Sequence, residues 1–189
     1  MENFLRLCRG ILPLSSLFSS DCKVCIVLGN ESCDLDSAVA TLVYAAFLQQ
    51  LNPSPNFVYL PVLNIARTEW KLRTEVLFWL RKVVPNLVDD SLFIFKEDIQ
   101  DLQPLKDSDA LEVILVDHNL LSPHDVNLAP FVVHVVDHHV NSGIFEEERC
   151  NISIEPVGSC CTLIAEQLFH LGSHVITPEI AALLRGKVV

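Results

Sequence analysis

A strand is predicted to turn into a helix at the stretch Gly29-Asn30-Glu31-Ser32-Cys33-Asp34-Leu35-Asp36-Ser37. The apolar run at 24–28 before it predicts a buried strand, and residues 38–51 after it predict a helix. Open α/β sheets bind their ligands at such turns, at the carboxyl ends of the strands. Asp34 and Asp36 either cap the helix or hold a cation, because two acids buried there without a cation would each cost several kcal/mol.

Strand and helix patterns alternate along the rest of the chain. Apolar runs predict strands at 57–63, 91–95, 111–116 and 131–136, with an edge strand at 151–155. Helices are predicted over 68–83 (with Thr68 as N-cap), over 160–171, and from the Thr177-Pro178 cap to 184. The polar segment 96–109 is expected at the surface, with room for one helical turn. This alternation predicts an α/β domain with a mainly parallel five- or six-stranded sheet and helices on both faces.

The domain is expected to cover residues 21–189, preceded by a lead-in helix and linker over 1–20. The formal charge of −11 argues against a nucleic-acid duplex as partner, since such a surface needs a basic stripe. Apolar runs fall short of the ~20 residues of a membrane helix, so no membrane partner is expected. Seven scattered cysteines, the Cys22-x-x-Cys25 pair included, are typical of reduced thiols and favour a cytoplasmic location.

Acidic and imidazole side chains follow three of the predicted strands. Asp34 and Asp36 follow the first, Asp117-His118 follows the run at 111–116, and Asp137-His138-His139 follows the run at 131–136. Because parallel strands end at one edge, these groups are expected to lie together. Carboxylates with imidazoles suit Mn²⁺, Mg²⁺, Co²⁺ or Zn²⁺, and the lack of thiolates disfavours a structural zinc site. Two such cations would activate a water molecule and clamp a phosphoryl group.

Five sequence motifs resemble those of the DHH phosphoesterases, and within that family the exopolyphosphatase/prune branch. They are the stretch 29–37, Pro61-Val-Leu-Asn-Ile-Ala-Arg67-Thr, Leu115-Val-Asp117-His-Asn, Val136-Asp137-His138-His139 and Val157-Gly-Ser159-Cys, and the resemblance covers about residues 22–189. It implies two divalent cations, Mn²⁺ or Mg²⁺, with Co²⁺ as a further option. Asp34 and Asp36 would bind separate cations, Asp117 would bridge them, and His138 would bind one.

The same resemblance implies roles for the remaining site residues. His139 would contact the phosphate, and Asp137 would orient the imidazoles. Asn30 stands where related pyrophosphatases carry a ligating histidine, and a neutral amide is a weaker ligand. Arg67 would bind phosphate, although it also fits the start of a helix. Gly158-Ser159 would let the backbone approach the site, or Ser159 would simply cap a helix.

The resemblance also predicts what the chain lacks. Family members carry a further aspartate and then a basic lid domain beyond the point where this sequence ends at Val189. We therefore expect an incomplete domain without the C-terminal lid, whose own activity is in doubt.

Three functions remain open from the sequence. The first is a metal-dependent hydrolase of phosphoanhydrides or phosphoesters, acting on short-chain polyphosphate, pyrophosphate-like compounds or cyclic nucleotides. The second is a regulatory module that keeps a partial metal site and acts through protein partners. The third, a nucleotide-binding Rossmann or flavodoxin-like domain, is disfavoured because no G-x-G-x-x-G motif occurs and the first turn carries two acids.

Overall fold

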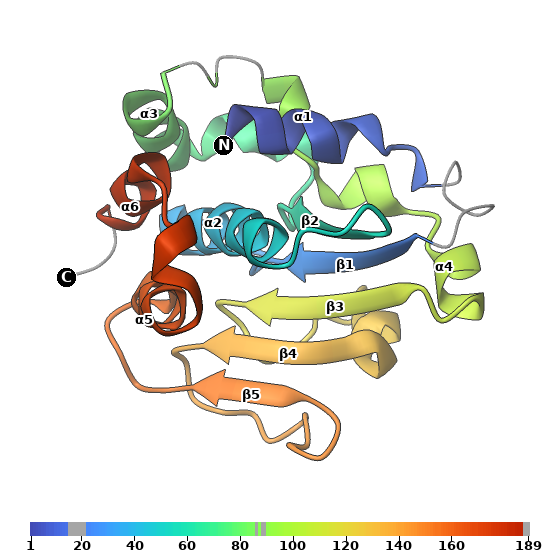
Figure 1. The fold of residues 1–189 in the computed structure, drawn as a ribbon. Coiled ribbons are helices and arrows are strands. Elements are labelled where there is room, and N and C mark those ends of the chain that lie inside the picture. The colour runs from blue at the N-terminus through green and yellow to red at the C-terminus, as the bar shows by residue number, and fades with distance from the viewer. Residues whose placement is uncertain (15–21, 86, 88–89, 187–189) are drawn as a thin grey trace.

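A five-stranded parallel sheet forms the centre of the fold (Figure 1). The computed structural model describes residues 1–14, 22–85, 87 and 90–186. Its strands are β1 (Lys23–Leu28), β2 (Phe57–Val62), β3 (Leu111–Val116), β4 (Val132–Asp137) and β5 (Asn151–Ile154). They lie in the order β2-β1-β3-β4-β5, and all four pairings are parallel. The predicted α/β class and parallel sheet are confirmed.

Helices cover both faces of the sheet. The α-helices are α1 (Glu2–Gly10), α2 (Leu35–Leu51), α3 (Thr74–Val83), α4 (Gln103–Asp107), α5 (Cys160–Gly172) and α6 (Pro178–Leu184). Shorter 3-10 helices span Arg67–Leu72, Asp90–Leu92, Lys96–Ile99, Val126–Phe131 and Ser173–Val175. Helices α2, α3, α5 and α6 share one core with one face of the sheet, and α4 joins the core on the other face. Within the described residues, no helix is long and apolar enough to cross a bilayer.

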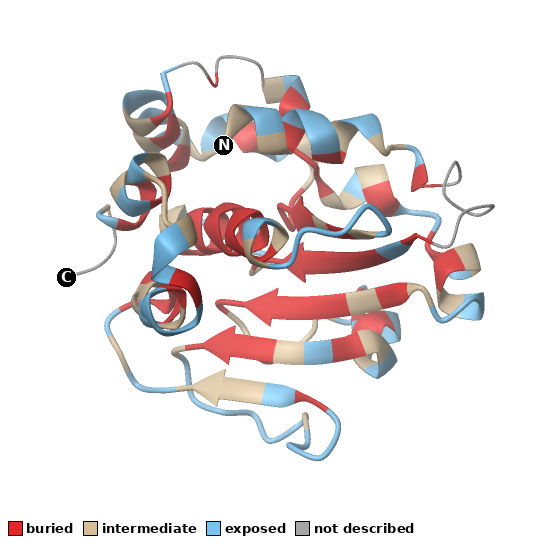
Figure 2. Cartoon of the chain, in the orientation of Figure 1, coloured by how far each residue is buried: buried red, intermediate tan, exposed pale blue. Residues whose placement is uncertain are grey.

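Helix α2 is the most enclosed helix of the fold (Figure 2). Every residue from Asp36 to Leu48 is buried, so α2 has no solvent face over that length. Gly29, at the end of β1, permits its close approach: a Cβ there would lie 2.6 Å from Thr41 Oγ1 and 2.7 Å from Ser37 Oγ. The strand-to-helix turn is therefore packed tightly enough to fix the positions of the residues around it.

Two predicted elements differ from the structure. The expected strand at 91–95 is a 3-10 turn over Asp90–Leu92, followed by a single bridge between Leu63 and Phe95. Its apolar residues are buried as predicted, but Asp98 accepts a hydrogen bond from the Phe95 N–H and a 3-10 helix begins at Lys96, so the strand ends there.

The helix expected over 68–83 is interrupted at Arg73. Residues 67–72 form a 3-10 helix, and α3 begins at Thr74. Thr68 is not an N-cap, since Ala66 holds that position. Trp70 is 2% exposed and packs against the Phe93 and Phe95 rings, and this burial accompanies the tighter turn. At the N-terminus, α1 supplies the expected lead-in helix, whereas the linker expected up to residue 20 lies largely outside the described residues.

Candidate metal centre

The strand ends of β1, β3 and β4 bring the predicted acids and imidazoles to one edge of the sheet. Asp137 is the last residue of β4, and Asp117 follows the last residue of β3. Asp117 adopts φ +64°, a left-handed conformation that costs energy for any residue with a Cβ. Its N–H donates to the Val136 carbonyl at 2.9 Å, so this turn is tied to the neighbouring strand. The buried Asp117 carboxylate is thereby held at the end of the sheet.

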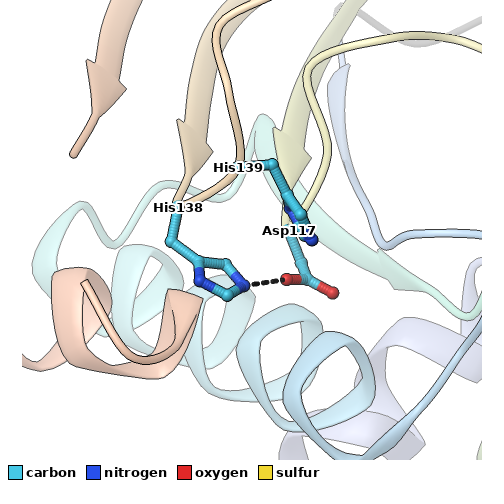
Figure 3. Close-up of side chains that lie close together, drawn as sticks. All are labelled: Asp117, His138 and His139. Carbon is cyan, nitrogen blue, oxygen red and sulfur yellow. Dashed lines mark ion pairs between the residues drawn. The ribbon is translucent and has the colours of Figure 1, made fainter. Parts of the chain in front are cut away.

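His138 faces two buried carboxylates, those of Asp117 and Asp36, and Figure 3 shows its ion pair with Asp117. Its Nε2 lies 3.3 Å from Asp117 Oδ1 and 3.6 Å from Asp36 Oδ2. Its Nδ1 lies 3.1 Å from the Val157 carbonyl, which can only accept a hydrogen bond, so Nδ1 carries a proton. In the neutral ring, Nε2 then turns a lone pair toward the acidic oxygens. Either a second proton or a metal cation is needed to make that arrangement favourable.

Asp137 holds the adjacent histidine. This fully buried carboxylate accepts hydrogen bonds at Oδ1 from the His138 and His139 N–H groups, and His139 Nδ1 lies 2.7 Å from the same oxygen. The His139 side chain is 54% exposed, and its ring centroid lies 4.4 Å from that of His138. Ligand atoms of Asp117, His138 and His139 all lie within 4.8 Å of one another, a spacing that a metal ion could span. The structure therefore brings these three predicted residues into one cluster.

Asp36 is bound by the first turn of α5. Its Oδ2 accepts from the Cys160 N–H at 2.8 Å and its Oδ1 from the Cys161 N–H at 3.0 Å. A helix N-terminus favours negative charge, so α5 stabilises the ionised carboxylate. Burial is the largest of the causes that raise the pKa of both cysteine thiols, and Sγ of each contacts a backbone carbonyl oxygen. Burial therefore keeps both thiols in the neutral form beside Asp36.

Asp34 and Asn30 shape the turn after β1. Asp34 is exposed and is the N-cap of α2, because its Oδ1 accepts from the Ser37 N–H at 3.0 Å. The capping alternative is thus observed for Asp34, and Asp36 lies in the first turn of the same helix. Asn30 Nδ2 donates to the Asp117 carbonyl at 3.0 Å, while its Oδ1 accepts from the Ser32 N–H. Asn30 therefore connects β1 to the Asp117 turn, and its role as a ligand stays a prediction.

Arg67 and Ser159 have other contacts. Arg67 Nη2 lies 2.5 Å from Asp98 Oδ2, and the guanidinium carbon stands 4.5 Å from the Phe95 ring centroid. Phosphate binding by Arg67 would have to compete with Asp98. Ser159 is the residue before α5, and its Oγ lies 3.3 Å from Thr162 Oγ1. Ser159 directly precedes the Cys160 and Cys161 N–H groups that bind Asp36, so it lies next to the candidate metal centre. Its predicted role there, as a helix cap or as a point of backbone approach, stays a prediction.

Sequence reasoning missed one supporting residue, Asn119. This buried side chain donates to Asp137 Oδ2 at 2.5 Å and to the Val140 carbonyl, and its Oδ1 accepts from the Ser142 N–H. The available signal was its place directly after Asp117-His118 at a predicted strand end. The backbone N–H groups of α5 at Asp36 gave no comparable signal, because they come from a segment far along the chain.

The donor set fits a divalent cation. Carboxylate and imidazole atoms converge at Asp36, Asp117 and His138, and each of these side chains is fixed by further hydrogen bonds or by the neighbouring charges. Oriented carboxylates and imidazoles of this kind are typical of Mn²⁺, Mg²⁺ and Zn²⁺ sites. The fold and this cluster define an α/β domain with a candidate metal centre at the carboxyl edge of its sheet.

Comparison with known proteins identifies the family. Residues 24–185 match the DHH family, N-terminal domain. The chain is 38% identical to human "Exopolyphosphatase PRUNE1", covering 100% of this chain and 39% of that protein. It is 26% identical to "Manganese-dependent inorganic pyrophosphatase" of Methanothrix thermoacetophila, over 86% of this chain and 45% of the relative. The chain belongs to the DHH family, and its likeness to the exopolyphosphatase/prune branch is confirmed.

A solved structure supports the fold. A chain titled "Crystal structure of Methanococcus jannaschii putative family II inorganic pyrophosphatase" superposes with a TM-score of 0.58 at 24% identity. The match covers 87% of this chain and 46% of that one. The present chain thus spans less than half the length of these relatives.

Proposed function

We propose that this chain forms the metal-binding part of a phosphohydrolase that cleaves phosphoanhydride or phosphoester bonds. The observation that carries the proposal is His138 Nε2, which lies within 3.6 Å of carboxylate oxygens of both Asp36 and Asp117. The names of the relatives support phosphate-containing substrates, with short-chain polyphosphate and pyrophosphate-like compounds as first candidates. The manganese dependence in one of these names supports Mn²⁺ as the first cation to test.

Asp36, Asp117 and His138 would hold the cation, with Asp34, the N-cap of α2, as a further ligand. Bound divalent cations polarise a phosphoryl oxygen and lower the pKa of water, which is the chemistry that this reaction needs. The N–H groups at the start of α5 hold the Asp36 carboxylate in place, and the Val157 carbonyl fixes the tautomer of His138 so that Nε2 faces the site.

His139 would act on the phosphate itself. Its Nδ1 is held by Asp137 Oδ1 at 2.7 Å, which leaves Nε2 as the outward-facing nitrogen of a half-exposed ring. When the ring is protonated, Nε2–H can donate to a phosphoryl or leaving-group oxygen, and Asp137 stabilises the resulting imidazolium. This assignment gives Asp137 an orienting role and His139 a substrate contact.

Metal binding and turnover test the proposal separately. We expect isothermal titration calorimetry to detect Mn²⁺ binding to the 189-residue chain, and Asp117→Asn to weaken it at least tenfold. Asp101→Asn, an exposed acid outside the site, is the control for loss of one charge. Phosphate release from tripolyphosphate is then measured with Mn²⁺ and with Mg²⁺, for this chain and for a longer form of the protein. Turnover that is independent of metal, or that survives Asp117→Asn, would overturn the proposal.

A further inference from the structure

A groove on α3 carries more positive than negative charge, in a chain whose formal charge is −11. This surface, hereafter the α3 groove, is about 640 Å³ in volume. Lys71, Arg81 and Lys82 line it, and Asp90 is the one acid among the described residues of its lining. Arg81 Nη2 lies 3.9 Å from Asp90 Oδ2, so one loosely paired carboxylate faces three cations.

The α3 groove also exposes apolar surface. Phe78 is 66% exposed, and Leu77 lines the groove with it. The Lys82 ammonium nitrogen stands 5.8 Å from the Phe78 ring centroid, so positive charge and aromatic surface are neighbours. A ligand that matches this groove must therefore combine negative charge with an apolar group.

The net charge of the chain decides between ligands of this kind. A bilayer or a nucleic-acid duplex presents negative charge over a large area, and the acidic remainder of this chain would repel it. A short peptide segment responds mainly to charges within about one Debye length, which is ~8 Å at physiological ionic strength. The α3 groove is therefore suited to an acidic peptide segment that carries an apolar side chain.

The loop between β4 and β5 contains such a segment. Its three consecutive glutamates, at 146–148, are exposed and have no ion-pair partner among the described residues. They follow Ile144, which is 53% exposed, and the partly buried Phe145. The acidic segment 97–109, all of which the structure describes, carries no exposed large apolar side chain. Residues 144–148, hereafter the acidic loop, thus match the α3 groove better.

The α3 groove and the acidic loop of one chain are far apart. Helix α3 packs against α2 and α6, whereas the acidic loop leads into β5, the strand at one edge of the sheet. Figure 1 shows α3 at the top of the view and the connection from β4 to β5 at the bottom. A contact between the two surfaces therefore requires two molecules.

We propose that the α3 groove binds the acidic loop of a second copy of this chain. Lys71, Arg81 and Lys82 would face the glutamates, and Ile144 would pack on Phe78. The net charge of each copy opposes association, but this long-range repulsion is screened at physiological ionic strength more than charges in direct contact are.

Such an association would restrain the loop that leaves the candidate metal centre. The Ser142 N–H donates to Asn119 Oδ1, and Asn119 in turn donates to Asp137. The acidic loop begins two residues after Ser142. The association itself needs no metal, so it goes beyond the proposed function and is tested independently of it.

Analytical ultracentrifugation of the metal-free 189-residue chain measures the association. At about 150 mM NaCl we expect a reversible dimer, or short chains of molecules if the exchange of loops is not reciprocal. Raising NaCl to about 1 M, where the Debye length is ~3 Å, should weaken the association about tenfold or more.

Charge reversal on each surface identifies the contact. Arg81→Glu with Lys82→Glu makes the groove acidic, and Glu147→Lys with Glu148→Lys makes the loop basic. Each double variant alone is expected to self-associate about tenfold or more weakly, because like charges then meet. An equimolar mixture of the two should associate to within about threefold of the wild type, since each groove again meets a loop of opposite charge.

Two further double variants control for net charge. Arg6→Glu with Lys23→Glu changes it as the groove variant does, and Asp101→Lys with Asp107→Lys changes it as the loop variant does. All four positions are exposed and lie outside both surfaces. We expect both controls to associate like the wild type, and circular dichroism checks that every variant is folded.

Each remaining outcome overturns the inference. A chain that stays monomeric at about 200 µM, well above the range of weak specific complexes, has no such contact. Association that survives both reversals, or that the mixture does not restore, uses other surfaces. Controls as weak as the test variants would assign the effect to net charge. Binding of the monomer to phosphatidylserine vesicles, lost in the groove variant, would assign the α3 groove to a membrane instead.

Discussion

Asn119 Nδ2 donates a hydrogen bond to Asp137 Oδ2 at 2.5 Å, and both side chains are buried. The same amide group donates to the Val140 carbonyl and its oxygen accepts from the Ser142 N–H. One side chain after β3 therefore fixes both the last residue of β4 and the loop beyond His139. The orientation of the two histidines depends on a residue that would not itself touch a metal.

Replacing Asn119 tests this support. Asn119→Ala leaves an oxygen of the buried Asp137 carboxylate without its donor, so we expect a loss of about 1–3 kcal/mol in the free energy of unfolding. Mn²⁺ affinity should fall about tenfold to a hundredfold, as for other residues that orient metal ligands. Urea unfolding and calorimetry measure the two effects. Asn141→Ala, in an exposed position of the following loop, is the control; equal behaviour of the two variants would contradict the prediction.

Asp34 and Asp36 can be distinguished by isosteric replacement. Asp36→Asn removes a charge bound by two N–H groups of α5, and the new amide can accept from only one of them. We expect a loss of about 1–3 kcal/mol in stability together with weaker Mn²⁺ binding. Asparagine is as good an N-cap as aspartate, so Asp34→Asn should leave stability within about 0.5 kcal/mol. If Asp34 binds metal, that variant will lose Mn²⁺ affinity without losing stability; unchanged affinity would remove it from the ligand set.

Gly29 is expected to tolerate no side chain. A Cβ there would lie 2.6 Å from Thr41 Oγ1, so Gly29→Ala must displace α2 and should cost about 1–3 kcal/mol in urea unfolding. Gly10→Ala is the matched control, because a Cβ at Gly10 meets nothing within 4 Å. A destabilisation of similar size in the two variants would show that the close approach of α2 is not the cause.

The free energy of unfolding should decrease as the pH is lowered, because of His134. Burial lowers the pKa of this imidazole to about 4 from the ordinary value of 6.5, so between these values the unfolded chain takes up a proton that the folded chain does not. The free energy of unfolding is therefore expected to fall by about 1 kcal/mol from pH 6.5 to 5.5 on this account. His134→Gln should remove that component, whereas His170→Gln, at an exposed position of α5, should not. Identical pH profiles for the wild type and His134→Gln would contradict the assignment.

Much of the fold follows from local patterns. Unbroken apolar runs predicted β1, β3 and β4. Asp34 and Thr177 indicated the starts of two helices, and the structure has both residues as N-caps. The run at 91–95 failed because periodicity cannot distinguish a short buried strand from a buried turn, and Asp98 ends the extended stretch after one bridge.

The candidate site was predictable only in part. Parallel strand ends must share an edge, so the meeting of Asp36, Asp117 and His138 followed from topology. The contacts that orient them did not, since Asp36 is held by Cys160, 124 residues away, and no local pattern encodes such a pairing. The role of Arg67 was implied by its place in a family motif and by the affinity of guanidinium for phosphate, whereas its contact with Asp98 depends on tertiary packing.

The carboxyl and amino ends of the parallel strands differ in how well they should tolerate an insertion. All the candidate ligands lie at the carboxyl ends of the strands, whereas the exposed connection at 52–56 leads into the amino end of β2. A peptide tag or fluorescent reporter spliced between Ser54 and Pro55 would thus sit across the width of the domain from the metal centre. That separation offers a place to label or tether the protein while its chemistry is being measured.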